Sequence, residues 1–394
     1  MIEINNKIDF EIDSKEIEKR KERIRKIWQY KQVDHIPLGI YIIDNKERFT
    51  RKEIETEKEK NLRFDLNSIK KSLNLLPDDY IPFLKPEVGC TTIPTILGSK
   101  VSYTEQFENY STVKEPIVYK IEDLEKLDIP QDKNEIIKKG LMPGNLEKIY
   151  YYKAVTKGSI DMTGIDIGGV LCGSVDIMDS NLFYMSLITE KERMLNYLEK
   201  LSDLYVKVQE ILTGEIGGLN KMMNIDWDVS WYPEGHKGYL SDDPCANFGV
   251  STFETFSKPF NKKIYDRFGY GGFHNCGPHP CASAYLQYDE KDAGKKVKAI
   301  NCSLQFTYKE LDKFISVFSG SETILYFLFE EEFYDSKKAI ELYKELVDKG
   351  IKYNTICIPS YPLDASSHSD DDIRDIYREF IKISKEYTLS LKLR

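Results

Sequence analysis

The residues of this 394-residue chain that are best suited to chemistry lie between Phe273 and Cys281. The segment also holds His274, Cys276 and His279, so it carries two of the five histidines and two of the seven cysteines. In an extended strand, alternate side chains project to the same face, so His274 and Cys276 would direct an imidazole nitrogen and a thiolate sulfur to one point. Zinc prefers such ligands. The pair therefore predicts a metal site that needs further ligands.

Two different sets of side chains would complete this site. In a compact version, His279 and Cys281 join the pair in a closed structural site, but Pro280 is placed as the first residue of a helix that would carry Cys281 away. In a dispersed version, which we favour, Cys357 from a later strand is the third ligand. Three protein ligands leave a fourth position open, as in catalytic zinc sites. The alternative without a metal makes these cysteines small buried hydrophobic residues and the histidine a hydrogen-bonded core residue.

Strands must position these ligands, and the chain contains several short apolar segments of strand length. They are residues 169–172, 272–274, 297–301, 324–329 and 353–358. Because helical patterns separate them, they indicate a parallel sheet covered by helices, and at this chain length they favour a (β/α)8 barrel, also called a TIM barrel. In such a barrel the active site lies at the carboxyl ends of the strands, which is where the histidine and both cysteines of the dispersed version fall.

Helix starts are marked by a hydroxyl or carboxyl residue followed three positions later by an acid. This pattern predicts helices that begin near Asp13, Thr189, Ser251, Thr307 and Ser369. We expect the helix around residues 339–349 to end at Gly350.

A single domain is expected. Residues 1–145 form an N-terminal elaboration with the first barrel elements, irregular and proline-punctuated from residue 34, and residues 146–394 form the main barrel with the metal site. No glycine-rich phosphate loop follows an early strand, which argues against a doubly wound nucleotide-binding fold.

The composition excludes several classes of protein. The net charge of −9 argues against a nucleic-acid binder, because nothing offsets the cost of approaching phosphates. The chain is 41% hydrophobic and 31% charged with a mean hydropathy of −0.46, as expected for a soluble enzyme. Its first ten residues lack a secretory pattern, and its most apolar run, residues 324–329, is too short for a bilayer. We expect a cytoplasmic protein with reduced thiols, without a membrane partner.

Several motifs, taken in order, resemble one enzyme family. His274-Asn275-Cys276-Gly277, Cys357-Ile358-Pro359 and the stretch from Arg23 to Pro37 resemble the uroporphyrinogen decarboxylase (URO-D) superfamily. In particular, these motifs resemble the zinc-dependent branch of that superfamily, the methylcobamide:coenzyme M methyltransferases and related corrinoid methyltransferases. Residues 241–260 are similar to the family's segment before the metal-bearing strand, and residues 359–363 resemble its closing loop.

This resemblance implies a (β/α)8 barrel, zinc ligands at His274, Cys276 and Cys357, and a corrinoid cofactor (a cobalamin) carried by a separate small protein. It implies transfer of a methyl group between that corrinoid and a small thiol or methylated substrate. Residues 36–42 are apolar and lack the arginines with which decarboxylases of the family grip porphyrinogen carboxylates, so porphyrinogen decarboxylation is not expected.

Zinc with an open position would support either direction of transfer. It would deprotonate a substrate thiol that then attacks the methyl group, or act as a Lewis acid on a methylated donor. Two alternatives stay open: a metal-free decarboxylase-like lyase on a carboxylated substrate, and a non-catalytic subunit that binds the corrinoid protein.

Polar residues near the expected mouth of the barrel are candidates for catalysis. Asp243 precedes the metal strand and could hydrogen-bond the histidine ligand or orient the substrate, and the alternative is a solvated loop that caps the next helix. Asn301 ends another strand and is the second candidate. Glu330 also follows a strand and would reach the mouth, unless its acidic run is solvated.

Overall fold

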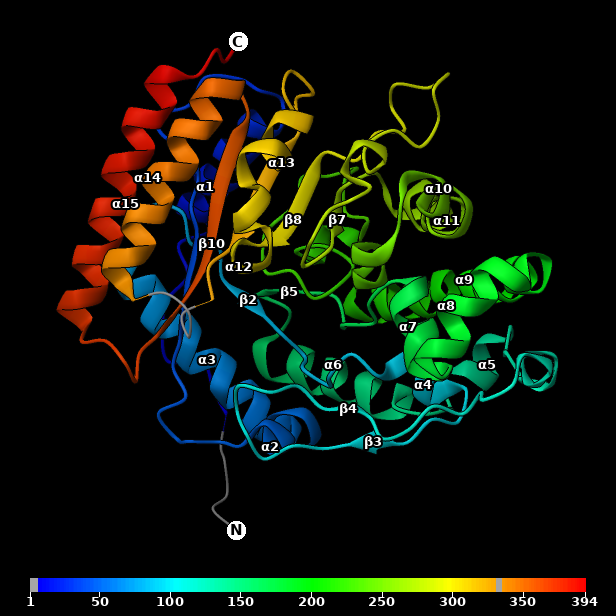
Figure 1. Ribbon diagram of the computed structural model, residues 1–394. Helices are drawn as coiled ribbons and strands as arrows, with labels where there is room; N and C mark the ends of the chain where they lie inside the picture. Colours follow the sequence, from blue (N-terminus) through cyan, green and yellow to red (C-terminus); the bar gives the residue numbers. More distant parts are fainter. Residues whose placement is uncertain (1–5, 331–334) are drawn as a thin grey trace.

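A parallel sheet of six strands forms the centre of the computed structural model, which describes residues 6–330 and 335–394 (Figure 1). The strand order is β1-β10-β9-β8-β7-β6, and every pairing is parallel. The bounds are β1 (Gly39–Ile43), β6 (Tyr239–Ser241), β7 (Gly272–His274), β8 (Ala299–Ser303), β9 (Ile324–Leu328) and β10 (Ile356–Asp364). The protein therefore has a mixed α/β fold, as the strand–helix pattern predicted.

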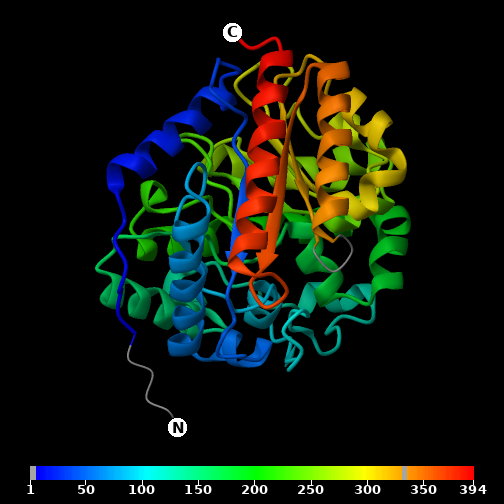
Figure 2. The same ribbon diagram turned by 90° about the vertical axis from the view of Figure 1, so that its left-hand side faces the viewer.

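Helices connect successive strands and cover the sheet. Figure 2 shows α14 and α15 side by side in front of β10. The connecting helices are α10 (Val250–Phe256), α11 (Lys258–Phe268), α12 (Leu304–Thr307), α13 (Leu311–Val317), α14 (Ser336–Tyr353) and α15 (Asp370–Ser390). The earlier helices are α1 (Ser14–Trp28), α2 (Arg51–Thr56), α3 (Lys58–Leu75), α4 (Thr92–Ile96), α5 (Lys133–Ile136), α6 (Met142–Thr156), α7 (Val170–Ile177), α8 (Ser180–Thr189) and α9 (Lys191–Ile216).

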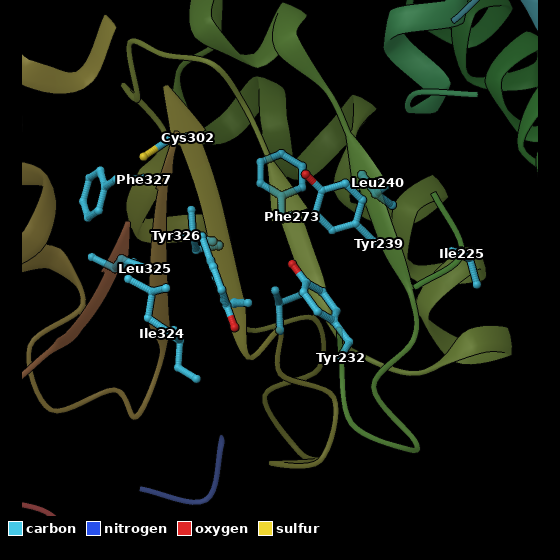
Figure 3. Close-up of a cluster of buried hydrophobic side chains, with 14 of the residues drawn as sticks. Ile225, Tyr232, Tyr239, Leu240, Phe273, Cys302, Ile324, Leu325, Tyr326 and Phe327 are labelled. Carbon is cyan, nitrogen blue, oxygen red and sulfur yellow. The ribbon is translucent and has the colours of Figure 1, made fainter. Parts of the chain in front are cut away.

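Side chains alternate between the two faces of the central strands, and both faces are packed. Figure 3 shows this for β9, where Leu325 and Phe327 point to one side and Tyr326 to the other. The ring of Tyr326 lies 6.2 Å from that of Tyr232, centroid to centroid. Burial on both faces explains the continuous apolar runs from which the strands were predicted.

A second parallel pair, β2 (Phe83–Leu84) with β5 (Asp161–Met162), extends the strand pairing beyond β6. The Met223 N–H donates to the Met162 carbonyl at 2.8 Å, and the Ile225 N–H donates to the Lys237 carbonyl at 3.0 Å. Among the described residues, no backbone pairing joins β2 to β1. The closed eight-stranded barrel expected from the sequence is thus not established by the pairing. A short antiparallel pair, β3 (Val101–Ser102) with β4 (Thr112–Val113), lies apart from both sheets.

Helix α3 occupies the seam between β1 and β2. Four of its side chains accept hydrogen bonds from backbone N–H groups of the two facing strand segments. The bonds run from Ile42 to Ser72 Oγ (3.0 Å), from Asp44 to Ser68 Oγ (3.0 Å), from Lys85 to Asp65 Oδ2 (2.8 Å) and from Glu87 to Asn61 Oδ1 (2.8 Å). Buried backbone donors need partners, and here the helix supplies the acceptors that a neighbouring strand would otherwise provide.

Two of the predicted helix starts are confirmed. Asp13 caps α1 by accepting hydrogen bonds from the first helical N–H groups, and Ser369 forms a full capping box with Asp372 at the start of α15. A helix also begins near each of the other three residues, but their side chains do not cap it. Helix α9 begins at Lys191, α10 begins at Val250 with Gly249 as its N-cap, and Thr307 ends α12 directly before the 3-10 helix η5 (Tyr308–Glu310).

Three further expectations for the secondary structure are wrong. Residues 169–172 begin α7 instead of forming a strand. Helix α14 continues past Gly350 and ends at Asn354, which adopts the left-handed conformation. The region from residue 34 to 145 is more regular than expected, because it contains β1 and the 18-residue helix α3.

No helix within the described parts of the chain is both long enough and apolar enough to cross a membrane.

Loss of one hydrogen-bond acceptor in the seam between β1 and β2 should lower the free energy of unfolding. Ser72 is fully buried, so Ser72→Ala would leave the Ile42 N–H without its partner, and we expect a loss of about 1–3 kcal/mol in the free energy of unfolding. Urea denaturation measures this change. As a control, Ser390→Ala at the exposed end of α15 should change the same quantity by less than about 0.5 kcal/mol. Equal effects of the two substitutions would contradict the role given to the seam.

Candidate metal site

His274 and Cys276 meet at the carboxyl end of β7, as the alternation rule predicted. His274 is the last residue of the strand and is 2% exposed, and Cys276 follows it in a partly exposed position. His274 Nε2 lies 3.2 Å from Cys276 Sγ. The imidazole nitrogen and the sulfur therefore point toward one another.

Asp243 supplies a third ligand atom from the neighbouring strand end. It follows β6 and begins the short 3-10 helix η3 (Asp243–Asn247). Its Oδ1 lies 3.6 Å from His274 Nε2 and accepts a hydrogen bond from the Cys276 N–H at 2.7 Å. One ligand atom from each of the three residues lies within 4.8 Å of the other two. The group offers nitrogen, sulfur and oxygen, all of which are zinc ligands.

The preceding residue, Asp242, anchors the loop that presents Asp243. Its carboxylate is fully buried and accepts hydrogen bonds from Ser257 Oγ (3.0 Å), Asn261 Nδ2 (2.9 Å) and the Leu171 N–H (3.0 Å). Burial raises the pKa of Asp242 to about 6. The carboxylate ties α7, α10 and α11 to the end of β6, so Asp243 is presented from a fixed backbone.

Asn301, from the middle of β8, orients the imidazole. The strand register pairs it directly with His274, and its Oδ1 lies 2.8 Å from His274 Nδ1. With the amide oxygen facing the ring, Nδ1 carries the proton and Nε2 presents a lone pair toward Cys276 and Asp243. Trp227 packs edge-on against the same ring, with centroids 5.1 Å apart. A hydrogen-bonded outer partner of this kind is typical of metal-binding histidines.

The structure does not bring Cys357 to this group. The register pairs Cys357 with Leu325, and through β8 it places Cys357 level with Phe273, one position before His274. Its side chain therefore lies on the opposite face of the sheet. There Cys357 is fully buried, its N–H donates to the Tyr387 hydroxyl at 3.0 Å, and burial raises the pKa of its thiol to about 12.

His279 and Cys281 also turn away, so the compact site does not form. His279 Nε2 lies 3.0 Å from Thr307 Oγ1, its ring stacks on Phe314 at 4.2 Å, and burial lowers its pKa to about 3. The Sγ atom of Cys281 lies 3.6 Å from the Cys245 carbonyl. The helix expected from Pro280 is only the short 3-10 helix η4 (Ala282–Ala284).

Two further groups lie near the site, Cys172, which the sequence did not indicate, and Glu330, which it did. Cys172, in the first turn of α7, accepts a hydrogen bond at its Sγ from the Asp243 N–H at 3.3 Å. Nothing in its surrounding sequence marks it as part of the site. Glu330 reaches the site, and its Oε2 accepts a hydrogen bond from Ser303 Oγ at 2.9 Å. Burial, the Asp243 charge and the Glu330 charge all raise the pKa of Cys276. The two negative charges among these causes would be offset by a bound cation.

Asp166 is a further carboxyl group near this centre. Burial, followed by the charge of Glu87, raises its pKa to about 7, and the charge of Asp243 contributes in the same direction. A carboxyl group with this pKa can exchange a proton at neutral pH.

Comparisons with known proteins show a likeness in fold. No family model matches the chain, and no curated protein matches its sequence. Among solved structures, the chain is similar to a methyltransferase from Methanosarcina mazei, with a TM-score of 0.65 and 16% sequence identity. The similarity covers 93% of this chain and 98% of that chain. At this identity the match shows that the two proteins share a fold.

Because Cys276 and Cys357 lie on opposite faces of the sheet, we expect their substitution to affect zinc binding differently. Cys276→Ala should abolish stoichiometric zinc binding, because it removes the sulfur beside His274 Nε2, whereas Cys357→Ala should retain zinc, because its side chain lies on the other face. Metal analysis of the purified variants, after dialysis against a weak chelator, measures the difference. Loss of zinc from Cys357→Ala with a native unfolding transition would contradict the site described above.

Proposed function

We propose that this protein is a zinc-dependent methyltransferase of the URO-D type that exchanges a methyl group with a corrinoid carried by a separate small protein. The observation that carries the proposal is the meeting of Asp243, His274 and Cys276 at the ends of two parallel strands. The shared fold with a methyltransferase supports it. The other substrate would be a small thiol or a methylated compound.

The same proposal treats the sheets as parts of one (β/α)8 barrel. The six-stranded sheet, the segment that contains Met223 and Ile225, and the β2–β5 pair would form the wall, with α3 in the seam between β2 and β1. Asp243, His274 and Cys276 would then lie at the carboxyl-end mouth, where barrel enzymes have their active sites.

The donor atoms suit zinc. His274 presents Nε2 because Asn301 holds Nδ1, Cys276 presents its sulfur, and Asp243 presents a carboxylate. Three such ligands leave a fourth position for a substrate. When bound, zinc would supply a Lewis acid that lowers the pKa of a substrate thiol or polarises a methylated donor.

The chain's own residues would orient the substrate and handle its proton. Cys276 is partly exposed, so the face of the site beside it is open to a small molecule. Asp166, with a pKa of about 7, would take up the proton that a substrate thiol releases or return one to a leaving group. The comparisons give no support to the decarboxylase-like lyase that the sequence left open.

Substitution of Asn301 should weaken zinc binding without abolishing it. Asn301→Leu removes the partner of His274 Nδ1 while keeping a side chain of similar size, and we expect zinc affinity to fall by about 10–100-fold. Competition with a chromophoric chelator measures the affinity. Asn247→Leu, which alters an exposed contact with Tyr184, is the matched control and should leave it unchanged. Unchanged affinity in Asn301→Leu would remove the asparagine from the site.

The direct test of function is methyl transfer. The protein would be incubated with methylated corrinoid protein and a panel of small thiols, or with reduced corrinoid protein and methylated donors, and the corrinoid absorption spectrum followed. We expect transfer that stops when zinc is removed, returns when zinc is restored, and fails in Cys276→Ala. Full transfer by zinc-free protein would overturn the proposal.

A further inference from the structure

A pocket lies in the seam between β1 and β2. Its cavity volume is about 100 Å³, several times the space that one water molecule needs. None of the three candidate metal ligands lines it. Its walls combine aromatic rings, including Tyr41, Phe64 and Phe107, with a small group of charged side chains from α2 and the segment after β2.

The cations that line this pocket outnumber the carboxylates that pair with them. Glu87 is the single carboxylate shared by two cations, with Oε2 3.1 Å from Lys85 Nζ and 3.8 Å from Arg51 Nη1. Asp65, the other acid of the lining, accepts a hydrogen bond from the Lys85 backbone N–H at 2.8 Å and forms no described ion pair with either cation, and burial raises its pKa well above its ordinary value. Asp166 lies near enough to influence Lys85, but its own pKa of about 7 leaves it partly protonated. Arg51 and Lys85 therefore divide the charge of one carboxylate among the described contacts.

The Arg51 guanidinium is held by two hydrogen bonds and a ring contact, whereas the Lys85 ammonium group has Glu87 as its partner within hydrogen-bond distance among the described contacts. Arg51 donates to the Phe107 carbonyl through Nε (2.9 Å) and Nη2 (2.7 Å), and the Tyr110 ring covers its guanidinium at 4.1 Å. These contacts hold the segment between β3 and β4 against the pocket, which Phe107 and Tyr110 line. Lys85 keeps 21% of its side chain exposed, and its ammonium group can donate three hydrogen bonds. Besides Glu87, its described contact is the Tyr110 ring at 5.5 Å.

We propose that the seam pocket binds a small organic anion, with its apolar part against the aromatic walls and its acidic group on Lys85 Nζ. A carboxylate, a sulfonate or a phosphate monoester would all satisfy this chemistry. None of the candidate metal ligands lines the pocket, so anion binding can be measured without the metal.

Three probes with one carbon skeleton and different charge test this proposal by isothermal titration calorimetry. They are 3-phenylpropionate, 3-phenylpropanol and 3-phenylpropylammonium. We expect the anion to bind and the alcohol and the ammonium compound to bind at least tenfold more weakly. Titrations with 2-phenylethanesulfonate and 2-phenylethyl phosphate identify the preferred acidic group.

Two substitutions in the pocket test whether the anion binds there, because one should weaken its binding and the other should strengthen it. Lys85→Met should weaken binding of the preferred anion at least tenfold, and Glu87→Gln should tighten it, because it removes the competing carboxylate. Lys382→Met on the surface of α15 is the matched control and should bind as the unmodified protein does. A fold damaged by Glu87→Gln could not produce tighter binding, so this variant separates recognition from stability.

Three results would overturn the inference: no binding of any of the anions, equal binding of the ammonium compound, or unchanged anion binding in folded Lys85→Met. Cys276→Ala should bind the anion normally. Failure of the metal site would therefore leave this result intact, and failure of the pocket would leave the metal measurements intact.

Discussion

The alternation of side chains along parallel strands held in register is the constraint on which the candidate site depends. It places His274 at the end of β7, beside Cys276 two residues later, and sets Asn301 against the imidazole. The same rule turns Cys357 toward the helices that cover the opposite face. Because a shift of one residue exchanges the two faces of a strand, the register decides which thiol can share a metal with the histidine.

This constraint also explains which parts of the site could be predicted from the sequence. The His-x-Cys pair is a local pattern, so its convergence needed only the correct assignment of one strand. Cys357 was correctly placed in a strand, but the face on which it lies depends on pairing across β8 and β9, which the chain does not reveal locally. Asp243 was predicted as an acidic neighbour of the histidine, and its approach to Cys276 depends on the buried carboxylate of Asp242.

The fold shows the same division between local and distant determinants. The apolar strands and the cap at Ser369 were predicted, because each depends on a few consecutive residues. The seam was not, since Ser72 and Asp65 meet backbone groups 30 and 20 residues away through single hydrogen bonds that leave no periodic pattern. Yet α3 in this seam separates β1 from β2 and creates a pocket that none of the candidate metal ligands lines. One helix thus both completes the hydrogen bonding of two strands and opens space between them.

The central claim is that one imidazole, one thiolate and one carboxylate form the protein's part of the metal site. X-ray absorption spectroscopy at the zinc edge of the zinc-loaded, substrate-free protein tests it most directly, because sulfur and nitrogen or oxygen neighbours scatter at different distances. The account predicts a single sulfur at about 2.3 Å, with the remaining neighbours being nitrogen or oxygen at about 2.0–2.2 Å. Two sulfur neighbours would contradict it, since the structure brings only the thiolate of Cys276 into the group with His274 and Asp243 among the residues it describes.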